Sequence, residues 1–284
     1  MPTRHPWLLM CPPDHYGIEY EINPWMSRSR GADRARAMRQ WRGLYETLLE
    51  LGAKVSLLDP VPGLPDMVFT ANAGMMFRNI FISSRFRPAV RAGESPHFEQ
   101  WFEAAGFAVH RLKEGTFFEG AGDALFCGAT LFGGYRIRSD ARSHQDVAKL
   151  IGCEALPVEL VNPRFYHLDT CFCPLACGAA IWFPDAFDFY GQQVMRGNVA
   201  DLIEVTADDS LRFGCNAVAV GRTVIIPADC SALRRELESR GFTVRELELD
   251  EFLKAGGSAK CLTLRIDGEE AAAWAAGADT QQRT

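Results

Sequence analysis

The sequence contains no apolar run that approaches the roughly 20 residues needed to cross a bilayer. Residues 1–10 also lack an apolar stretch followed by a small-residue cleavage site, which a secretory signal would have. The net charge is -6, and Lys and Arg are scattered among Asp and Glu rather than gathered into a basic face. These absences predict a soluble, cytoplasmic protein that binds neither membranes nor nucleic acid.

No linker or low-complexity segment divides the 284 residues, of which 48% are hydrophobic. The chain can therefore bury a large core. Its length also allows two domains, but the missing linker favours one catalytic domain over residues 1–284. Residues 269–284 are rich in Ala and end in QQRT, so they are expected to form a loose C-terminal tail.

Nine cysteines are an odd number spread over a long chain. In a reducing compartment this pattern indicates buried thiols and room for one reactive thiol, rather than a disulfide framework. Cys171, Cys173 and Cys177 invite a zinc hypothesis, but no second cluster completes the set of four ligands that zinc prefers. Their apolar neighbours predict a buried strand instead, and neither a metal nor another cofactor is expected.

A short block recurs five times at intervals of 46 to 50 residues. Helical patterns fall between the blocks at residues 33–51, 95–106, 139–150, 186–196 and 228–240. Short strands follow most of them, as at residues 53–58, 107–112 and 242–249, so the unit is strand, strand, helix, strand. The blocks are VFTANAGMMF from Val68, FFEGAGDALF from Phe117, HLDTCFCPL from His167, GCNAVAVGRTVII from Gly214 and KCLTLRI from Lys260.

Five such units predict a ring, provided that the ends of the chain meet. A strand near residues 7–11 would close the ring by pairing beside residues 261–266. Closure would remove exposed sheet edges and produce a single domain. The alternative is a doubly wound α/β domain whose strands and helices alternate without closing.

Polar and reactive residues occur at equivalent points of the blocks, and equivalent points converge on the axis of a ring. Such convergence of residues that are distant in sequence is what a catalytic site requires. The residues are Asn72, Glu119, Asp123, His167, Asp169 and Cys261.

Cys261 follows GGSAK, whose two glycines allow a sharply bent loop to bring the thiol near a ligand. A free cysteine is more often a small buried apolar side chain, but its place after a glycine-rich loop favours a functional thiol here. The adjacent Lys260 would lower the pKa of the thiol if the two side chains faced the same site.

His167 and Asp169 are two residues apart, which on a strand places both side chains on one face. Such a pair serves as a base with its carboxylate partner, although a histidine satisfied in the core gives the same pattern. Glu119 and Asp123 stand in EGAGD inside an otherwise apolar block. Buried there, they would need a cation or a hydrogen-bond donor, which a bound guanidinium supplies, whereas in a turn they would be solvated.

With FTAN, FEGAGD, HLD and GGSAKC in this order, the sequence resembles the guanidino-group-modifying superfamily over nearly its whole length. The resemblance implies an α/β fold, the five-bladed propeller called pentein, built of ββαβ units with pseudo-fivefold symmetry. The segment MCPPDHYGIEYEINPWM is most similar to the arginine dihydrolases, which convert L-arginine to ornithine, carbon dioxide and two ammonia molecules. Asn72 stands where arginine deiminases carry an aspartate, and Asn23 matches a second asparagine of the dihydrolases.

The resemblance also implies roles. Cys261 would be the nucleophile and His167 the general acid and base, with Glu119, Asp123 and Asp169 as partners of His167 and of the guanidinium.

The remaining implied roles concern substrate binding. Asn23 and Asn72 would bind the neutral ureido group that follows the first hydrolysis, because an amide donates as well as accepts hydrogen bonds. Arg91 and Arg138 lie 19 residues after Asn72 and Glu119, offsets at which the deiminases hold arginines that bind the substrate carboxylate. Taken singly, each of these arginines is typical of a solvated surface charge.

Arginine deiminase, dimethylarginine dimethylaminohydrolase and amidinotransferase are the alternative activities within the superfamily, because they share most of the chemistry. A non-catalytic arginine-binding or redox-sensing protein, with the cysteines of residues 171–177 as its working part, is the alternative outside it. A homo-oligomer is expected only because many soluble enzymes form one.

Overall fold

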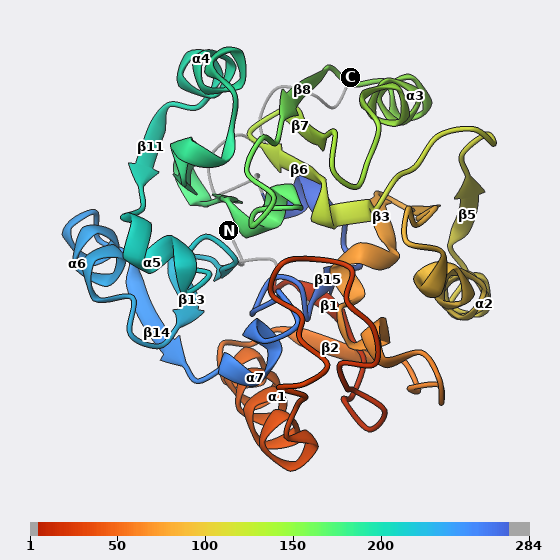
Figure 1. The fold of residues 1–284 in the computed structure, drawn as a ribbon. Helices are drawn as coiled ribbons and strands as arrows, with labels where there is room; N and C mark the ends of the chain where they lie inside the picture. The colour runs from red at the N-terminus through yellow and green to blue at the C-terminus, as the bar shows by residue number, and fades with distance from the viewer. Residues whose placement is uncertain (1–4, 273–284) are drawn as a thin grey trace.

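Five separate three-stranded sheets surround a central axis in the computed structural model, which describes residues 5–272 (Figure 1). In each sheet two strands pair antiparallel, and a third strand, which follows a helix, pairs parallel to the middle one. This arrangement confirms the predicted unit and the pentein fold, and it excludes the open doubly wound sheet. The sheets are β15 (Leu264–Arg265), β1 (Trp7–Met10) and β2 (Lys54–Leu57); β3 (Gly74–Phe77), β4 (Ile80–Ser83) and β5 (Ala108–Arg111); β6 (Ala124–Cys127), β7 (Thr130–Tyr135) and β8 (Ala155–Glu159); β9 (Phe172–Pro174), β10 (Ala179–Trp182) and β11 (Asp201–Glu204); β12 (Val218–Val220), β13 (Thr223–Pro227) and β14 (Thr243–Leu247).

The helix of each unit lies on the outside of the ring (Figure 1). Along the chain it follows the middle strand and precedes the parallel strand. The helices that cover the five sheets are α1 (Arg34–Glu50), α2 (Ser95–Ala104), α3 (Ala141–Ile151), α4 (Phe189–Asn198) and α6 (Ser231–Ser239), and two short helices, α5 (Ala207–Leu211) and α7 (Asp250–Leu253), lie in the loops. All five predicted helices are therefore present, with ends within a few residues of the predicted ones.

The first helix shows how the sequence sets these ends. Asp33 caps α1, because its carboxylate accepts a hydrogen bond from the backbone N–H of Arg36. The helix buries a stripe centred on Trp41 and Leu44, and Met38 and Tyr45 are half-buried at the margins of this stripe.

The two ends of the chain close the ring in the first sheet, as predicted. β15 pairs antiparallel with β1, with Leu8 opposite Arg265 and Leu9 opposite Leu264, and β2 pairs parallel with β1 on the other side. This sheet therefore forms only when segments more than 250 residues apart in sequence meet.

Closure does not remove the sheet edges, contrary to the prediction, because the five sheets are separate and each keeps an outer strand. These outer strands carry charged residues, among them Lys54 in β2, Arg111 in β5 and Glu159 in β8. Charges on an edge strand oppose pairing with a strand of another chain.

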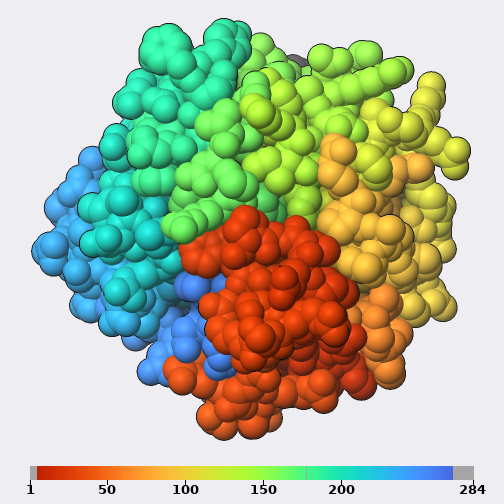
Figure 2. Space-filling view, in the orientation of Figure 1, coloured from red at the N-terminus to blue at the C-terminus, as the bar shows by residue number. Residues whose placement is uncertain are grey.

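The core fills the space between neighbouring blades. Its largest cluster joins the third, fourth and fifth sheets and includes Phe132, Phe172, Trp182 and Ile226, with the rings of Phe132 and Phe172 in edge contact at 5.4 Å. On one face of the ring, the N-terminal segment, drawn red, covers the middle (Figure 2).

The C-terminal tail was predicted to be loose from residue 269, but residues 269–272 are held in the fold. Residues Glu269–Ala272 form the 3-10 helix η8, in which Glu269 and Glu270 are buried. Glu269 accepts a hydrogen bond from Lys260, and Glu270 accepts one from the backbone N–H of Arg78, which holds this turn in place. The rest of the predicted tail lies outside the described residues, and the organisation of residues 1–284 as one catalytic domain stays a prediction.

Within residues 5–272, no helix combines the length and the apolar composition that a membrane span requires.

Leu264→Ala is expected to lower the free energy of unfolding by about 2–5 kcal/mol, because Leu264 is fully buried in the closing sheet. Leu57→Ala is the control: Leu57 lies in the same sheet but is 45% exposed, so its truncation should change the free energy by about 0.5 kcal/mol or less. Urea denaturation followed by circular dichroism measures both. Equal effects would contradict a stabilising role for ring closure.

Candidate active site

Three short 3-10 turns pack side by side near the axis of the ring and bring the predicted site residues together. They are η2 (Thr70–Ala73), η4 (Gly120–Gly122) and η5 (Leu168–Thr170), which precede β3, β6 and β9 in successive blades. A Cβ atom on Gly122 would lie 2.4 Å from Nδ2 of Asn72 and 3.4 Å from the ring of His167. The EGAGD glycine therefore lets Asn72 and His167 approach each other.

Cys261 lies in the turn that joins α7 to β15 and is 2% exposed. Gly256, at a φ of 86°, makes the left-handed bend that the glycine pair predicted. The Cys261 sulfur lies 3.2 Å from Oδ2 of Asp169 and 3.1 Å from Nδ2 of Asn216. Burial, followed by the charge of Asp169, raises the pKa of Cys261 well above its ordinary value, so a nearby cation or donor is needed to stabilise the thiolate.

Lys260 pairs with Glu269 instead of facing the thiol, so the condition for its predicted effect on the thiol pKa is not met. Its ammonium group lies 3.2 Å from Glu269, and its charge favours the ionised form of Asp169. Burial is the larger effect and raises the pKa of Asp169 to about 7. Asp169 can therefore exchange a proton near neutral pH, and its nearest partner for that exchange is the Cys261 thiol.

His167 is fully buried, and its Nε2 lies 2.7 Å from Oε2 of Glu119. The same oxygen accepts a hydrogen bond from Nη1 of Arg138 at 3.0 Å. Although burial opposes it, the Arg138 charge and then the His167 hydrogen bond lower the pKa of Glu119, which stays a carboxylate. Burial lowers the pKa of His167 to about 4. At neutral pH the imidazole is therefore uncharged and free to accept a proton.

Glu119, which the resemblance named among the partners of His167, is thus its carboxylate partner, and the pairing of His167 with Asp169 that strand spacing predicted is wrong. The prediction failed because residues 167–170 are not a strand: His167 precedes the turn η5, and the side chains of His167 and Asp169 have different partners. His167 contacts Glu119 of the third blade, and Asp169 contacts the sulfur of Cys261.

Asn72 is held in one orientation by Arg91. Nη1 of Arg91 donates to Oδ1 of Asn72 at 2.9 Å, so Nδ2 faces Nδ1 of His167, 3.5 Å away. Arg91 is itself held by two hydrogen bonds to Glu94, at 2.7 and 2.8 Å. Both Arg91 and Arg138 are 3% exposed, so their reading as surface charges is wrong.

The remaining predicted residues lie further from the sulfur. Asp123 accepts hydrogen bonds from Ser139 at 2.6 Å and from the backbone N–H of Leu168 at 3.0 Å, and it does not line the pocket, so its placement does not support the predicted contact with substrate. Asn23 does line the pocket, where its side chain bonds the backbone of Trp25 and Ala255.

The pocket in front of Cys261 is narrow, with a volume of about 10 Å³. The N-terminal segment covers it, since Ile22 accepts a hydrogen bond from Arg138 and Trp25 donates one to the backbone of Arg164. A ligand larger than a water molecule therefore requires the cover or the lining side chains to move. The lining residues are Ile22, Asn23, Met26, Asp66, Phe69, Asn72, Arg91, Arg138, Tyr166, Ala255 and Cys261.

Asp66 and Asn216 are site residues that sequence reasoning missed. Asp66 is 1% exposed, and its Oδ1 has no hydrogen-bond partner in the described structure, which leaves a buried acceptor at the pocket wall. Asn216 contacts the sulfur of Cys261. The repeat contained a signal for Asn216, because GCNAV of the fourth block aligns its Asn-Ala pair with that of FTANAG in the first. Asp66 and Glu94 lie outside the blocks, so the repeat gives no signal for them.

The cysteines after His167 belong to the core, as predicted for Cys171 and Cys173, both of which are buried. The side chain of Cys177 lies outside the described part of the structure. Among the described residues, no group of three or more His, Cys, Asp or Glu side chains is placed to hold a metal ion.

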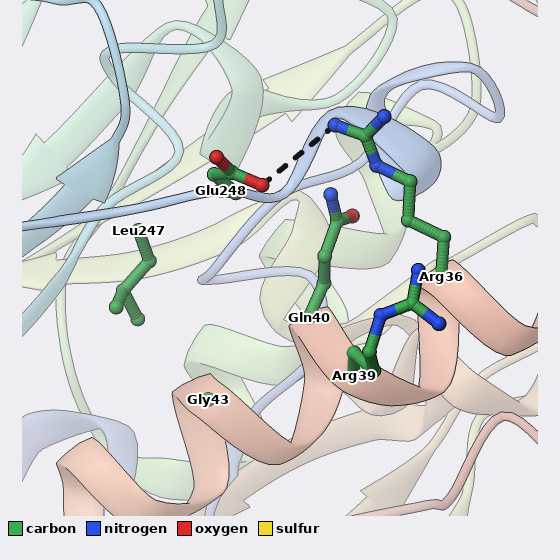
Figure 3. A pocket seen from close by; sticks show the side chains of 6 residues that line it. All are labelled: Arg36, Arg39, Gln40, Gly43, Leu247 and Glu248. Atoms are coloured by element: carbon green, nitrogen blue, oxygen red, sulfur yellow. Dashed lines mark ion pairs between the residues drawn. The ribbon is translucent and has the colours of Figure 1, made fainter.

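A larger pocket of about 400 Å³ lies between α1 and β14, away from these residues (Figure 3). Arg36 and Arg39 project from the helix at its rim, and Arg36 pairs with Glu248 at 3.7 Å. Its lining contains no cysteine or histidine, so the narrow pocket at Cys261 is the candidate active site.

Comparison with known proteins agrees with this geometry. A family profile described as N,N dimethylarginine dimethylhydrolase, eukaryotic, matches residues 19–267. The chain belongs to this family. The dimethylarginine dimethylaminohydrolase of Mycobacterium tuberculosis is 38% identical to it over 90% of this chain and 84% of that protein.

AgrE of Nostoc sp., a bifunctional arginine dihydrolase/ornithine cyclodeaminase, is 48% identical over 91% of this chain. The match covers 37% of AgrE, so this chain spans little more than a third of that relative. ArgZ of Synechocystis sp. is a second bifunctional relative. The structure of its N-terminal domain, with serine in place of an asparagine and a covalently bound reaction intermediate, has a TM-score of 0.89 at 46% identity, over 92% of this chain and 97% of that domain.

Glu94→Ala is expected to lower the free energy of unfolding by about 3–5 kcal/mol, because it leaves the Arg91 charge buried without its carboxylate. Glu99→Ala removes a glutamate whose partner, Arg111, is 59% exposed, and it should change the free energy by about 1 kcal/mol or less. Urea denaturation at neutral pH measures both. A small effect of Glu94→Ala would mean that another group neutralises Arg91.

Proposed function

We propose that this chain is an arginine dihydrolase, which hydrolyses L-arginine to ornithine, carbon dioxide and two ammonia molecules. The observation that carries the proposal is the oriented amide of Asn72, which stands beside the neutral His167 and lines the same pocket as the Cys261 thiol. An amide can bind a neutral ureido group as well as a cation, whereas a carboxylate favours the cation alone. The identity with AgrE, which is named for this activity, supports the proposal.

The charges in the pocket wall suit an amino-acid ligand. Among the described contacts, Arg138 uses two of its five N–H donors and Arg91 uses four, which leaves donors on both for a substrate carboxylate. The unpaired oxygen of Asp66 is an acceptor for an ammonium or guanidinium group. L-Arginine carries a negative carboxylate and positive ammonium and guanidinium groups, so it can pair with both kinds of side chain.

In the first hydrolysis the Cys261 sulfur attacks the guanidinium carbon. Asp169, whose Oδ2 lies 3.2 Å from the sulfur, accepts the thiol proton and returns it to the leaving nitrogen, which departs as ammonia and leaves a thiouronium-type intermediate. Water then attacks this carbon and gives a proton to His167, while Glu119 stabilises the charged imidazole. The carbon–sulfur bond breaks, and citrulline and the cysteine are released.

In the second hydrolysis the sulfur attacks the neutral ureido carbon, and the second ammonia leaves. Water converts the resulting thiocarbamate to a carbamate, which decomposes to ornithine and carbon dioxide. Asn72 supports this step, because its Nδ2 can donate to the ureido oxygen, and Asn23 contributes a second amide at the pocket wall.

A dimethylarginine dimethylaminohydrolase is the second candidate, because the relative from Mycobacterium tuberculosis with that name matches this chain over most of both lengths. Release of dimethylamine from asymmetric dimethylarginine, faster than ammonia from arginine, would favour it. In either case the free thiols of the described cysteines suit the reducing cytoplasm as the site of action.

Incubation of the purified protein with L-arginine is expected to yield one ornithine and two ammonia molecules per arginine consumed, measured by amino-acid chromatography and an ammonia assay. Cys261→Ser should abolish both products, because the hydroxyl is a far weaker nucleophile than the thiolate. Citrulline with a single ammonia would replace the proposal with a deiminase. Turnover that survives in Cys261→Ser would remove the nucleophile from the mechanism.

Asn72→Asp is expected to raise the ratio of citrulline to ornithine by about tenfold or more, since it replaces a donor to the neutral ureido group with a carboxylate that favours the cation. Asn79→Asp, the same chemical change at an exposed turn of the adjacent hairpin, is the control and should leave the ratio unaltered. The ratio at partial conversion is the measurement. No change in Asn72→Asp would refute the role given to this amide.

A further inference from the structure

Asn216 is fully buried between the fifth blade and the loop that carries the nucleophile. Its Oδ1 accepts hydrogen bonds from the backbone N–H groups of Ser258, at 3.0 Å, and of Cys261, at 3.1 Å. Its Nδ2 donates to the backbone oxygen of Asp169 at 2.9 Å and to the Cys261 sulfur at 3.1 Å. One side chain therefore holds the loop and touches the reacting atom.

The orientation of this amide is decided by its partners. Backbone N–H groups can only donate, so the oxygen of Asn216 must face Ser258 and Cys261. A flipped amide would set its own N–H groups against them. Nδ2 consequently faces the sulfur, and its two hydrogens are both used, one by the Asp169 carbonyl and one by Cys261.

We infer that Asn216 is the permanent hydrogen-bond donor to the Cys261 thiolate, and that the second hydrolysis of arginine depends on it more than the first. This inference rests on the proposed dihydrolase function. In the first hydrolysis the guanidinium charge of the substrate favours the thiolate. The ureido group of citrulline is neutral and gives no such help, so the thiolate then relies on donors that belong to the protein.

The groups around the sulfur explain why this donor matters. Asp169, from η5, opposes ionisation of the thiol, and the buried phenol of Tyr166 faces the same region. Lys260 lies beside Glu269 and acts on Asp169. The backbone N–H of Ser258 and the amide of Asn216 favour the thiolate, and Asn216 also holds that N–H in place. Asn216 is therefore the side chain that both supplies and positions the donors.

The test uses a substitution that separates the two halves of the amide. Asn216→Asp keeps an oxygen for the Ser258 and Cys261 N–H groups but replaces the donor to the sulfur with a carboxylate oxygen. Thr263→Val is the matched control, because Thr263 is buried in the same loop and bonds the Ala259 and Lys260 carbonyls without touching the sulfur. A merely structural role predicts the same behaviour for both variants.

The first measurement is the rate at which iodoacetamide alkylates Cys261 without substrate, from about pH 7 to about pH 11 because burial raises the pKa of this thiol, read by mass spectrometry of the Cys261 peptide. The midpoint of this profile should rise by about one pH unit or more in Asn216→Asp, since the sulfur loses a donor and gains a negative neighbour. It should stay unchanged in Thr263→Val even if the melting temperature falls. An unchanged midpoint in Asn216→Asp overturns the inference, whatever the products.

The second measurement is the ratio of citrulline to ornithine formed from L-arginine. Asn216→Asp should raise this ratio about tenfold or more relative to the wild type, and Thr263→Val should not. A raised midpoint with an unaltered ratio overturns the claim about the second hydrolysis. If the wild type stops at citrulline, the dihydrolase proposal and the claim about the second hydrolysis are both overturned. A raised midpoint in Asn216→Asp would still support the donor role of Asn216 in that case.

Discussion

The carboxylate of Glu119 lies at the centre of the ring with no exposure to solvent, and the charged groups of the site are arranged around it. Arg138 compensates its charge and His167 hydrogen-bonds the same oxygen, while its second oxygen accepts the backbone N–H of Arg87. A buried carboxylate without such partners would be too costly to keep ionised. The segments after β4 and β7 supply Arg87 and Arg138, and the residue before η5 supplies His167, so the fold brings these partners together from three places in the chain.

A buried charge also needs partners on the other side of Asn72, where Arg91 and Glu94 form a second buried ion pair. Glu94 holds Arg91, Arg91 orients the amide of Asn72, and the amide presents its N–H to His167. Because each contact determines the next, Asn72 cannot turn its oxygen toward the histidine without breaking the bond to Arg91. The chemistry proposed for the neutral ureido group therefore depends on the ion pair of Arg91 with Glu94, which orients the amide.

The repeat in the sequence predicted more of the structure than any single motif did. Its five blocks and intervening helices gave the unit, the ring and the pairing of β1 with β15, because hydrophobic period and turn residues are local properties that the fold retains. The same local reasoning failed for His167 and Asp169, which were interpreted as part of a strand. His167 precedes a 3-10 turn, and Asp169 lies within that turn. It also failed for residues 269–272, whose glutamates are held by Lys260 and Arg78 from elsewhere in the chain.

The sequence by itself determined which residue types gather near the axis, since equivalent positions of a closed repeat must converge. Only the tertiary structure decided which of them are partners: Glu119 with His167, and Asp169 and Asn216 with Cys261. The reason is that hydrogen bonds depend on distances of about 3 Å between atoms from different blades, and a pattern along one chain carries no information on that scale. Asp66 and Glu94 stand outside the repeat, so the fold alone brought them to the site.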